Sequence, residues 1–348
     1  MKLSDVDRRL KILQVNDNWD EYIKRFKSLD VYYSKEYTIL FSKIQKGIPQ
    51  AAYFESEGGR VFYPFIKRKI DCAEGFFDII TPYGYGGPVY EGKKVMMHHF
   101  YKQFTKYCLD ESIITETIGC HPLINNSMFL TDIMQVDYIR RTVSVDLTPS
   151  FEHIKAQFSS SNRRNIKKAL RSGITTYVSS NKRELDEFIQ LYYETMNRNQ
   201  ASSFYHFEHS YFYQQMEETS LSKSVLIVAK QGSDIVGGVI LLVGGDFAHY
   251  HLGASSKDAL MYRPNNLLFQ AMIEYAKEQG AKTIHLGGGY TDDDNLYKYK
   301  ASFSNESPQK YYLGKHIINE RAYEQIVKLA GINDAFGEYF PAYRKISE

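Results

Sequence analysis

SVLIVAKQGSDIVGGVILLVGGDFAHYHLG, residues 224–253, decides the fold class. It contains three apolar runs rich in β-branched residues, separated by Gly232–Asp234 and Gly244–Asp246, which predicts an antiparallel meander joined by hairpin turns. The next stretch, NNLLFQAMIEYAKEQG at 265–280, places its large apolar residues on one helical face and ends at Gly280. A strand at 282–289 and a short helix at 295–303 complete a unit of hairpin, helix and strand.

The first half of the chain shows the same order of elements. A helix capped by Ser34 and ending near Gly47 precedes two strands, AAYFES (51–56) and RVFYPFIKR (60–68), and a glycine-rich loop at 81–88 follows. A helix at 94–109 and strands at 111–119 and 141–147 come next, and a last strand pair is expected within 309–319. We therefore predict an α+β fold with a mixed α/β sheet, built from two copies of one unit at 1–150 and 151–348.

Composition limits the classes of function. The 348 residues carry 43 Lys and Arg against 41 Asp and Glu, a net charge of +2, so no whole-molecule field draws the chain to nucleic acid or membrane. The charged N-terminus has no signal-peptide core and no apolar run approaches the length of a membrane span, which predicts a soluble, cytoplasmic protein without a transmembrane segment. Cys72, Cys108 and Cys120 match no zinc or redox spacing and are expected to be reduced core residues.

One local stretch is strongly basic. In FEHIKAQFSSSNRRNIKKALRSGI, residues 151–174, a helical projection gathers five cations within an arc of about 140°. They are Arg163, Arg164, Lys167, Lys168 and Arg171, and they lie opposite a predicted core face of Ile166, Ala169 and Leu170. This face can dock phosphate groups of a nucleotide or an RNA backbone, or it can be a solvated surface.

Two further clusters could carry chemistry. LGGGYTDDDNLYKYK, residues 286–300, lacks the P-loop pattern, so Asp292 and Asp294 would either hold a divalent cation or cap the following helix. His249 and His251 lie two apart on a strand and could be general bases or structural histidines. Neither cluster supplies a recognisable metal-ligand spacing, and no metal site is predicted.

Several of these stretches, in this order, resemble the FemAB family of tRNA-dependent aminoacyl transferases and the wider group of FemAB-like GNAT-fold acyltransferases. The resemblance rests on TPYGYGGP (81–88), SSNRRNIKKALRSGI (160–174), HYHLGAS (249–255), LLFQAMIEYAKEQGAKTIHLGGG (267–289) and LYKYKASF (296–303). It implies two GNAT-like domains related by duplication, with most of the active cleft in the C-terminal one.

The resemblance also implies roles for individual residues. LYKYK resembles a family motif whose aromatic residue and lysine serve transfer, which points to Tyr299 and Lys300 as catalytic. Arg163 and Arg164, with Lys167 on the same face, would bind substrate phosphates, and Arg263 lies where GNAT proteins hold a pyrophosphate.

Other positions are less well matched. The family's N-terminal substrate lysine could be Lys35 or Lys43, and Ser304 replaces a glycine that is usual in the family. YRPNNLL (262–268) lacks the glycine-rich pyrophosphate loop of acetyl-CoA enzymes, which disfavours coenzyme A. From their place in the glycine-rich loop, Tyr83 and Tyr85 are interpreted as cleft or core residues, and His251 is added as a substrate-binding candidate.

The expected function is transfer of an amino acid from aminoacyl-tRNA to the peptide amine of a UDP-linked or lipid-linked peptidoglycan precursor, without a cofactor and with room for peripheral membrane contact. Two alternatives stay open. One is an N-acyltransferase that uses acetyl-CoA or another acyl-CoA on an unknown amine. The other is a non-catalytic RNA- or precursor-binding module. A metal-dependent sugar-nucleotide transferase is the weakest reading.

Overall fold

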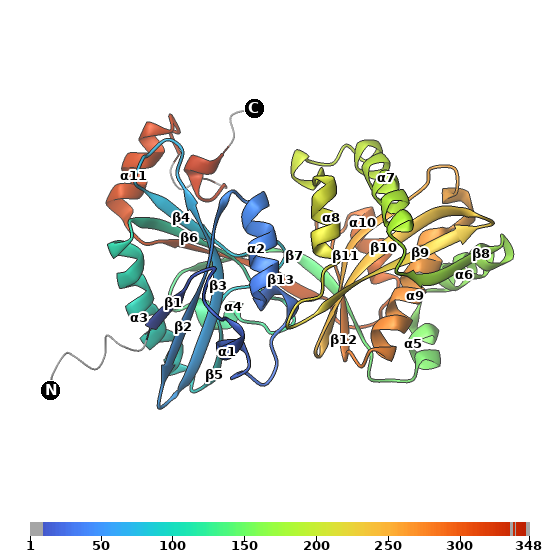
Figure 1. Cartoon of the computed structure of the whole chain (residues 1–348), viewed down its shortest axis with the longest axis horizontal. Helices are drawn as coiled ribbons and strands as arrows, with labels where there is room; N and C mark the ends of the chain where they lie inside the picture. The colour runs from blue at the N-terminus through green and yellow to red at the C-terminus, as the bar shows by residue number, and fades with distance from the viewer. Residues whose placement is uncertain (1–9, 335–336, 338, 346–348) are drawn as a thin grey trace. The chain divides into compact units, whose positions relative to one another are not determined.

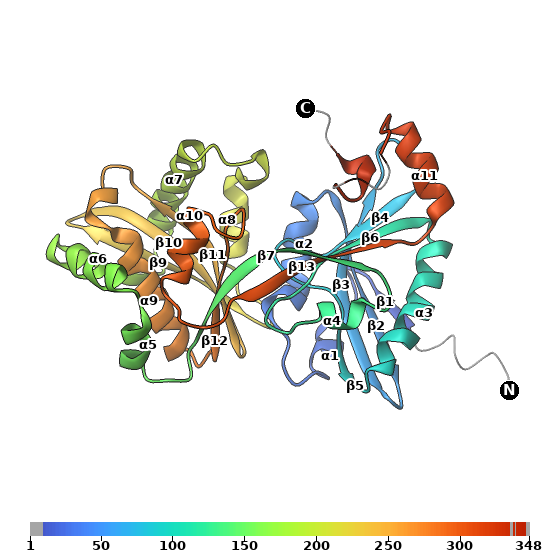
Figure 2. The same cartoon turned by 180° about the vertical axis from the view of Figure 1, so that it is seen from behind.

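The computed structural model describes residues 10–334, 337 and 339–345. Residues 1–9, which contribute to the prediction that no signal peptide is present, lie outside the described residues. The chain forms two compact units (Figures 1 and 2). The first contains the residues up to Lys27, Tyr32–Ile139 and those from Lys310 onward, and the second contains Ser28–Val31 and Arg140–Gln309.

This division differs from the boundary expected at residue 150. β13 (Gln309–Ile317) pairs antiparallel with β6 (Ile113–Gly119), so the C-terminal residues belong to the first unit. The end of β7 (Gln135–Asp146) pairs with β12 (Thr283–Gly288) of the second unit. Residues 309–317 form one strand rather than a strand pair, because no turn interrupts them.

The first unit is a mixed sheet covered by helices. Its strand order is β1-β2-β3-β4-β6-β13, with β5 paired to β3; β4 and β6 run parallel, and β1–β2, β2–β3, β3–β4, β3–β5 and β6–β13 are antiparallel. The remaining strands are β1 (Leu10–Leu13), β2 (Gly47–Ser56), β3 (Gly59–Lys69), β4 (Phe77–Ile80) and β5 (Val89–Gly92). The helices are α1 (Asp20–Ile23), α2 (Lys35–Ile44), α3 (Val95–Asp110), α4 (Ser127–Leu130) and α11 (Glu320–Leu329), with short turns at Val31–Tyr33 and Ala342–Arg344.

Alternation along β3 builds the core of this unit. Val61, Tyr63 and Phe65 pack with α3 residues, whereas Phe62 contacts Trp19. The predicted cap of α2 is confirmed, because the Ser34 hydroxyl accepts from the Tyr37 N–H at 3.2 Å. Cys108 and Cys120 are buried as expected, but the prediction is wrong for the third cysteine, Cys72, which is exposed in the turn after β3.

The second unit is also a mixed sheet, with strand order β7-β12-β11-β10-β9-β8. The predicted meander is confirmed as β9 (Lys223–Gln231), β10 (Asp234–Gly244) and β11 (Phe247–Ser255), and β8 (Ile174–Ser179) forms the edge. The helices are α5 (Phe151–Gln157), α6 (Ser160–Arg171), α7 (Lys182–Arg198), α8 (His209–Gln215), α9 (Pro264–Glu278) and α10 (Asn295–Ala301), with short turns η2 (Ser203–Tyr205) and η3 (Leu260–Tyr262).

Two adjacent glycines of β10 show how helices cover both faces of this sheet. A Cβ at Gly237 would meet Leu268 of α9 at 3.2 Å, and a Cβ at Gly238 would meet Phe188 of α7 at 2.7 Å. Because successive residues of a strand point to opposite faces, α9 and α7 lie on opposite sides of the sheet. Figure 1 shows this arrangement, and the distance at Gly238 leaves no room for a side chain.

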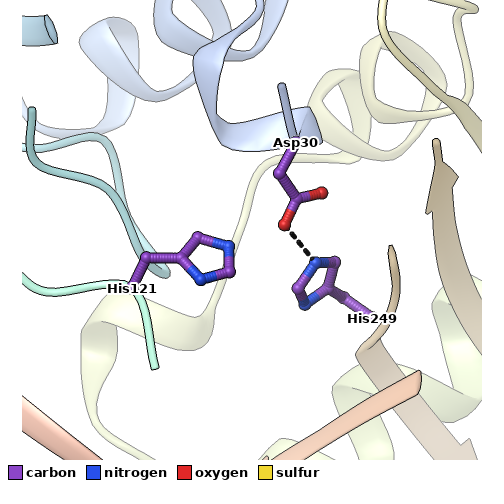
Figure 3. Close-up of side chains that lie close together, drawn as sticks. All are labelled: Asp30, His121 and His249. Carbon is purple, nitrogen blue, oxygen red and sulfur yellow. Dashed lines mark hydrogen bonds and ion pairs between the residues drawn. The ribbon is translucent and has the colours of Figure 1, made fainter. Parts of the chain in front are cut away.

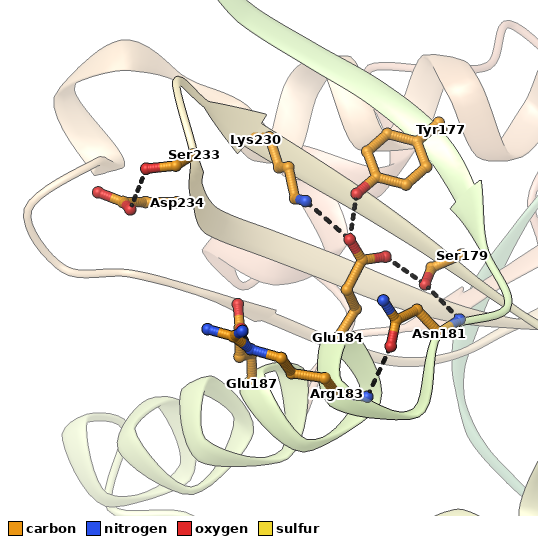
Figure 4. A network of polar contacts seen from close by, with 9 residues as sticks. All are labelled: Tyr177, Ser179, Asn181, Arg183, Glu184, Glu187, Lys230, Ser233 and Asp234. Atoms are coloured by element: carbon orange, nitrogen blue, oxygen red, sulfur yellow. Dashed lines mark hydrogen bonds and ion pairs between the residues drawn. The ribbon is translucent and has the colours of Figure 1, made fainter.

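A polar network joins α7 to the edge of the sheet (Figure 4). The Glu184 carboxylate accepts hydrogen bonds from Lys230 at 2.7 Å, Tyr177 at 2.5 Å and Ser179. These hydrogen bonds lower the pKa of Glu184 to about 2. The side chain of Glu184 is 12% exposed and that of Lys230 is 26% exposed, so water screens this pair less than a surface pair.

We expect Glu184→Gln to lower the free energy of unfolding by about 2 kcal/mol at neutral pH, because the charged hydrogen bonds to Lys230, Tyr177 and Ser179 weaken. The contribution of Glu184 is fully present above its usual pKa of 4.5 and is lost as the pH falls through about 2. Glu187→Gln is the control, since its partner Arg183 is 86% exposed and the pair contributes little. Equal stability of the two variants in urea denaturation would contradict this account.

Among the described residues, no helix combines the length and the apolar character that crossing a bilayer would require.

Candidate functional site

The candidate site lies where two parallel strands of the second unit separate. β11 and β12 pair only from Phe247–Thr283 to His249–His285. Beyond that point β12 pairs with β7 through Gly287 and Gly288, and β11 stays paired with β10. The ladder between β11 and β12 therefore ends midway along both strands, and side chains can enter between their continuations.

Lys300 of α10 contacts both strands beyond the point where they separate. Its Nζ donates a hydrogen bond to the Gly288 carbonyl at the end of β12, at 2.8 Å, and lies 5.2 Å from the ring centroid of Tyr250 on β11. The residue is only 6% exposed. An ammonium group carries three N–H donors, so the contact with Gly288 leaves others available for a substrate oxygen.

The surroundings of Lys300 lower the pKa of its amine. Burial and the positive charge of Arg140 lower the pKa of Lys300 from 10.5 to about 7, against an opposing effect of Asp294. Arg140 is held at this position by a 3.0 Å hydrogen bond to the Gly289 carbonyl. Lys300 therefore changes protonation state near neutral pH, as residues at reactive sites often do.

Tyr299, the second predicted catalytic residue, forms the apolar side of the site. Its ring contacts Phe269 and Phe303 with centroid distances of 5.1 and 5.4 Å. Its hydroxyl is buried and has no hydrogen-bond partner among the described residues. A buried hydroxyl without a partner costs free energy, so a substrate group that binds it would recover that cost.

The acidic residues before α10 position the helix. The Asp294 carboxylate accepts from the Tyr297 N–H at 2.7 Å and from the N–H groups of Tyr290 and Thr291. Burial tends to raise the pKa of Asp294, but these backbone hydrogen bonds outweigh burial and lower it. Arg141 binds the two neighbouring carboxylates: its backbone N–H donates to Asp292 and its guanidinium donates to Asp293. Of the two predicted roles, the structure shows the cap for Asp294.

His251 lies at a bulge of β11. The register between β10 and β11 shifts there, because Ile240 faces Leu252 and Leu241 faces Tyr250. The Tyr211 hydroxyl of α8 lies 2.5 Å from His251 Nε2. Burial, with a smaller contribution from His249, lowers the pKa of His251 to about 3, so its imidazole is neutral at physiological pH.

His249 has a different environment. Its Nε2 lies 2.6 Å from the Asp30 carboxylate, and both side chains are at most 2% exposed (Figure 3). Its ring also lies 5.8 Å from that of His285, which is directly across from it on β12. Each of the two predicted histidines thus has a hydrogen-bond partner, as structural histidines do.

The basic helix is confirmed as α6, with one correction. All three predicted phosphate-binding cations are exposed, but the Arg163 guanidinium donates to the carbonyls of Ala156 and Phe158, at the end of α5. Leu170 is 53% exposed and is not part of the core face predicted for it. The helix packs on α9 through Asn162, Ile166 and Ala169, and this rotates Leu170 toward solvent.

Arg263 is exposed and marks the N-terminus of α9. It adopts the left-handed conformation, with φ 68°, immediately before Pro264 at the first helical position. A non-glycine residue in this conformation is uncommon and is often found at functional sites.

The remaining predicted residues belong to the first unit. The Tyr83 ring lies 5.4 Å from Phe41, and its carbonyl accepts from the Tyr37 hydroxyl. Tyr85 contacts Tyr32 and Tyr311 with centroid distances of 5.6 and 5.4 Å. Both are half-buried in an aromatic cluster. Of the two candidate lysines, Lys35 donates to the Asp17 carbonyl, and Lys43 is exposed.

Three residues of the site were not predicted from the sequence, and only one of them has a sequence feature that could have indicated it. Tyr250, Arg140 and Tyr211 act on Lys300 or His251 through packing of elements that are distant in sequence. Tyr250 lies within the HYHLG stretch, and its placement between two histidines was the one available indication.

Comparisons with known proteins agree with the fold. Residues 156–301 match the family model for an acetyltransferase (GNAT) domain. A lipid II:glycine glycyltransferase of Staphylococcus epidermidis is 28% identical over 100 residues, which cover 27% of this chain and 24% of the relative. The chain therefore spans about a quarter of the length of the curated relatives it matches.

Two solved structures resemble most of the chain. The crystal structure of FemX aligns with a TM-score of 0.68 and 14% identity, over 88% of this chain and 97% of FemX. A tandem GNAT protein from the clavulanic acid biosynthesis pathway aligns with a TM-score of 0.50 and 10% identity, over 89% and 99%. At these identities the likeness concerns the fold. The chain is therefore a mixed α/β protein with two GNAT-like domains, and its resemblance to FemAB-like proteins of the GNAT fold is confirmed.

Proposed function

We propose that the protein is an acyltransferase that adds an amino acid to the peptide amine of a lipid-linked peptidoglycan precursor, with aminoacyl-tRNA as the donor. The observation that carries the proposal is the buried Lys300 between the diverging strands β11 and β12, inside the part of the chain that matches a GNAT domain. The lipid II:glycine glycyltransferases among its relatives favour glycine as the amino acid and lipid II as the acceptor.

The chemistry of this reaction suits a buried ammonium group. The acceptor amine attacks the ester carbonyl, a C–N bond forms, and the carbonyl oxygen becomes an oxyanion. The C–O ester bond then breaks, and the ribose hydroxyl leaves with a proton that the amine releases. An N–H of Lys300 that points at the oxyanion stabilises it, and a site with little water makes this interaction strong.

Phosphate groups of the precursor would bind on α6. Arg164 and Lys167 are exposed on this helix and have no ion pair with any described residue, whereas Arg163 is engaged by carbonyls of α5. We therefore assign phosphate binding to Arg164 and Lys167 and a positioning role to Arg163. Arg263 at the start of α9, and Tyr83, Tyr85 and His251, remain predicted substrate contacts. Charged tRNA as the donor places the reaction in the cytoplasm.

A second function has specific support. The matched family model describes an acetyltransferase. Arg263 lies at the N-terminus of α9, where its charge and the helix dipole would both attract a phosphate group. An acyl-CoA could therefore replace aminoacyl-tRNA as the donor, with the same role for Lys300. One assay separates the donors. The protein is incubated with lipid II and either glycyl-tRNA or acetyl-CoA, and the mass added to lipid II is read by mass spectrometry.

We expect Lys300→Ala to reduce the rate of transfer by about 100-fold or more, because the oxyanion loses its donor. Lys298→Ala is the matched control on the same helix, since Lys298 is exposed. Circular dichroism and the melting temperature establish that both variants fold. Full activity of Lys300→Ala, or an equal loss in both variants, would exclude Lys300 from the reaction.

The pH dependence tests the protonation state of Lys300. If the charged form of Lys300 is required, the rate falls as the pH rises through about 7. The acceptor amine has the opposite effect on the rate, because it becomes nucleophilic as it loses its proton. In Lys300→Arg the cation persists to high pH, so the falling limb should move to higher pH even if the maximal rate drops. A falling limb that stays in place in Lys300→Arg would assign it to another group.

A further inference from the structure

The outer face of α6 combines positive charge with exposed apolar side chains. Arg164, Lys167, Lys168 and Arg171 are exposed, and their side chains have no ion pair or hydrogen bond to the part of the chain that the structure describes. No acidic residue occurs between Ser160 and Arg171. The chain as a whole is nearly neutral, so this helix is a local concentration of positive charge.

Large apolar side chains are exposed on α6 and on a turn that packs against it. Leu170 is 53% exposed within α6 itself, next to Arg171. The short turn η3 packs against α6 and exposes Leu260 at 37% and Met261 at 60%. We call these seven residues the α6 surface: Arg164, Lys167, Lys168, Leu170, Arg171, Leu260 and Met261.

The α6 surface is held rigidly by contacts on its inner side. Ile166 and Ala169 are buried, Asn162 accepts from Asn266 of α9 at 2.8 Å, and its amide donates to the Ser302 hydroxyl at 2.7 Å. Ser302 immediately follows α10, the helix that carries Lys300. Whatever binds the α6 surface is therefore held at a fixed position relative to the catalytic helix.

We propose that the α6 surface docks the protein on an anionic lipid bilayer. Lysine and arginine are attracted to anionic headgroups, and neighbouring leucine and methionine side chains can insert at the boundary of the acyl chains. An RNA partner would favour cations interleaved with aromatic residues for base stacking. The exposed apolar residues of the α6 surface are aliphatic, and this favours lipid over RNA.

The inference deepens the proposed function, because a lipid-linked acceptor lies in such a bilayer, but it does not depend on turnover. Vesicle binding is measured without donor or acceptor. The two experiments are therefore independent. A protein that fails to bind vesicles can still be tested for transfer, and a protein that shows no transfer can still be tested for vesicle binding.

The experiment is co-sedimentation of the full chain with vesicles of phosphatidylcholine and phosphatidylglycerol in equal parts, with phosphatidylcholine vesicles for comparison. We expect binding to the anionic vesicles that weakens with salt. The double variant Lys168→Glu with Arg171→Glu should reduce it by about tenfold or more, and Leu170→Ser by about fivefold.

A second amphipathic helix supplies matched controls. α11 carries exposed Arg321 and Lys328, and its Leu329 is 68% exposed. Arg321→Glu with Lys328→Glu makes the same change in net charge, and Leu329→Ser removes the same side chain. Both controls should bind anionic vesicles like the unchanged protein, and the melting temperature confirms that all variants fold.

Three results would overturn the proposal. The first is no binding to anionic vesicles at low salt. The second is an equal loss in the α6 and α11 variants, which would show that net charge alone determines binding. The third is binding of transfer RNA, but not of vesicles, that the α6 double variant abolishes.

Discussion

Lys300 donates a hydrogen bond from a buried amine to the Gly288 carbonyl, and the arrangement of the candidate site depends on this contact. The carbonyl is accessible because β12 stops pairing with β11 after His285 and turns its last residues to β7. Tyr250 supplies an aromatic surface from β11, and Arg140 supplies a second positive charge. Removing a charge from water beside another charge is costly, so the amine titrates near neutral pH.

The same fold also gives hydrogen-bond partners to the acidic side chains that precede α10. Asp294 is committed to the N-terminus of α10, and Arg141 holds Asp292 and Asp293. Asn162 of α6 donates a hydrogen bond to Ser302, which directly follows α10, so α6 is connected to the end of the helix that carries Lys300. Tyr299 packs its ring against the core, and its buried hydroxyl has no hydrogen-bond partner among the described residues.

Local patterns allowed much of this to be predicted. The meander, the cap by Asp294 three residues before Tyr297, and the basic face of α6 each follow from spacing within a short stretch. Leu170 lies outside the core face that the spacing predicts, because the buried side of α6 is centred on Asn162, Ile166 and Ala169 and Leu170 lies about 70° from this centre on a helical projection.

Local sequence patterns do not predict contacts between segments that are distant in sequence. β13 follows the second unit in sequence but pairs with β6 of the first, so a boundary drawn at residue 150 could not describe the units. Tyr250 and Arg140 approach Lys300 from strands that are 50 and 160 residues away in sequence. The LYKYK motif singles out Lys300 as a candidate, and only the packing of distant segments explains why its pKa is lowered.

The most direct test of this account is the titration of Lys300 itself. Lysine side chains labelled with ¹⁵N can be followed by NMR as the pH is raised, with Lys300→Arg used to assign the signal. The account predicts that one lysine, absent from the spectrum of that variant, loses its proton near pH 7, far below the usual 10.5. A Lys300 that stays protonated until about pH 10 would contradict it.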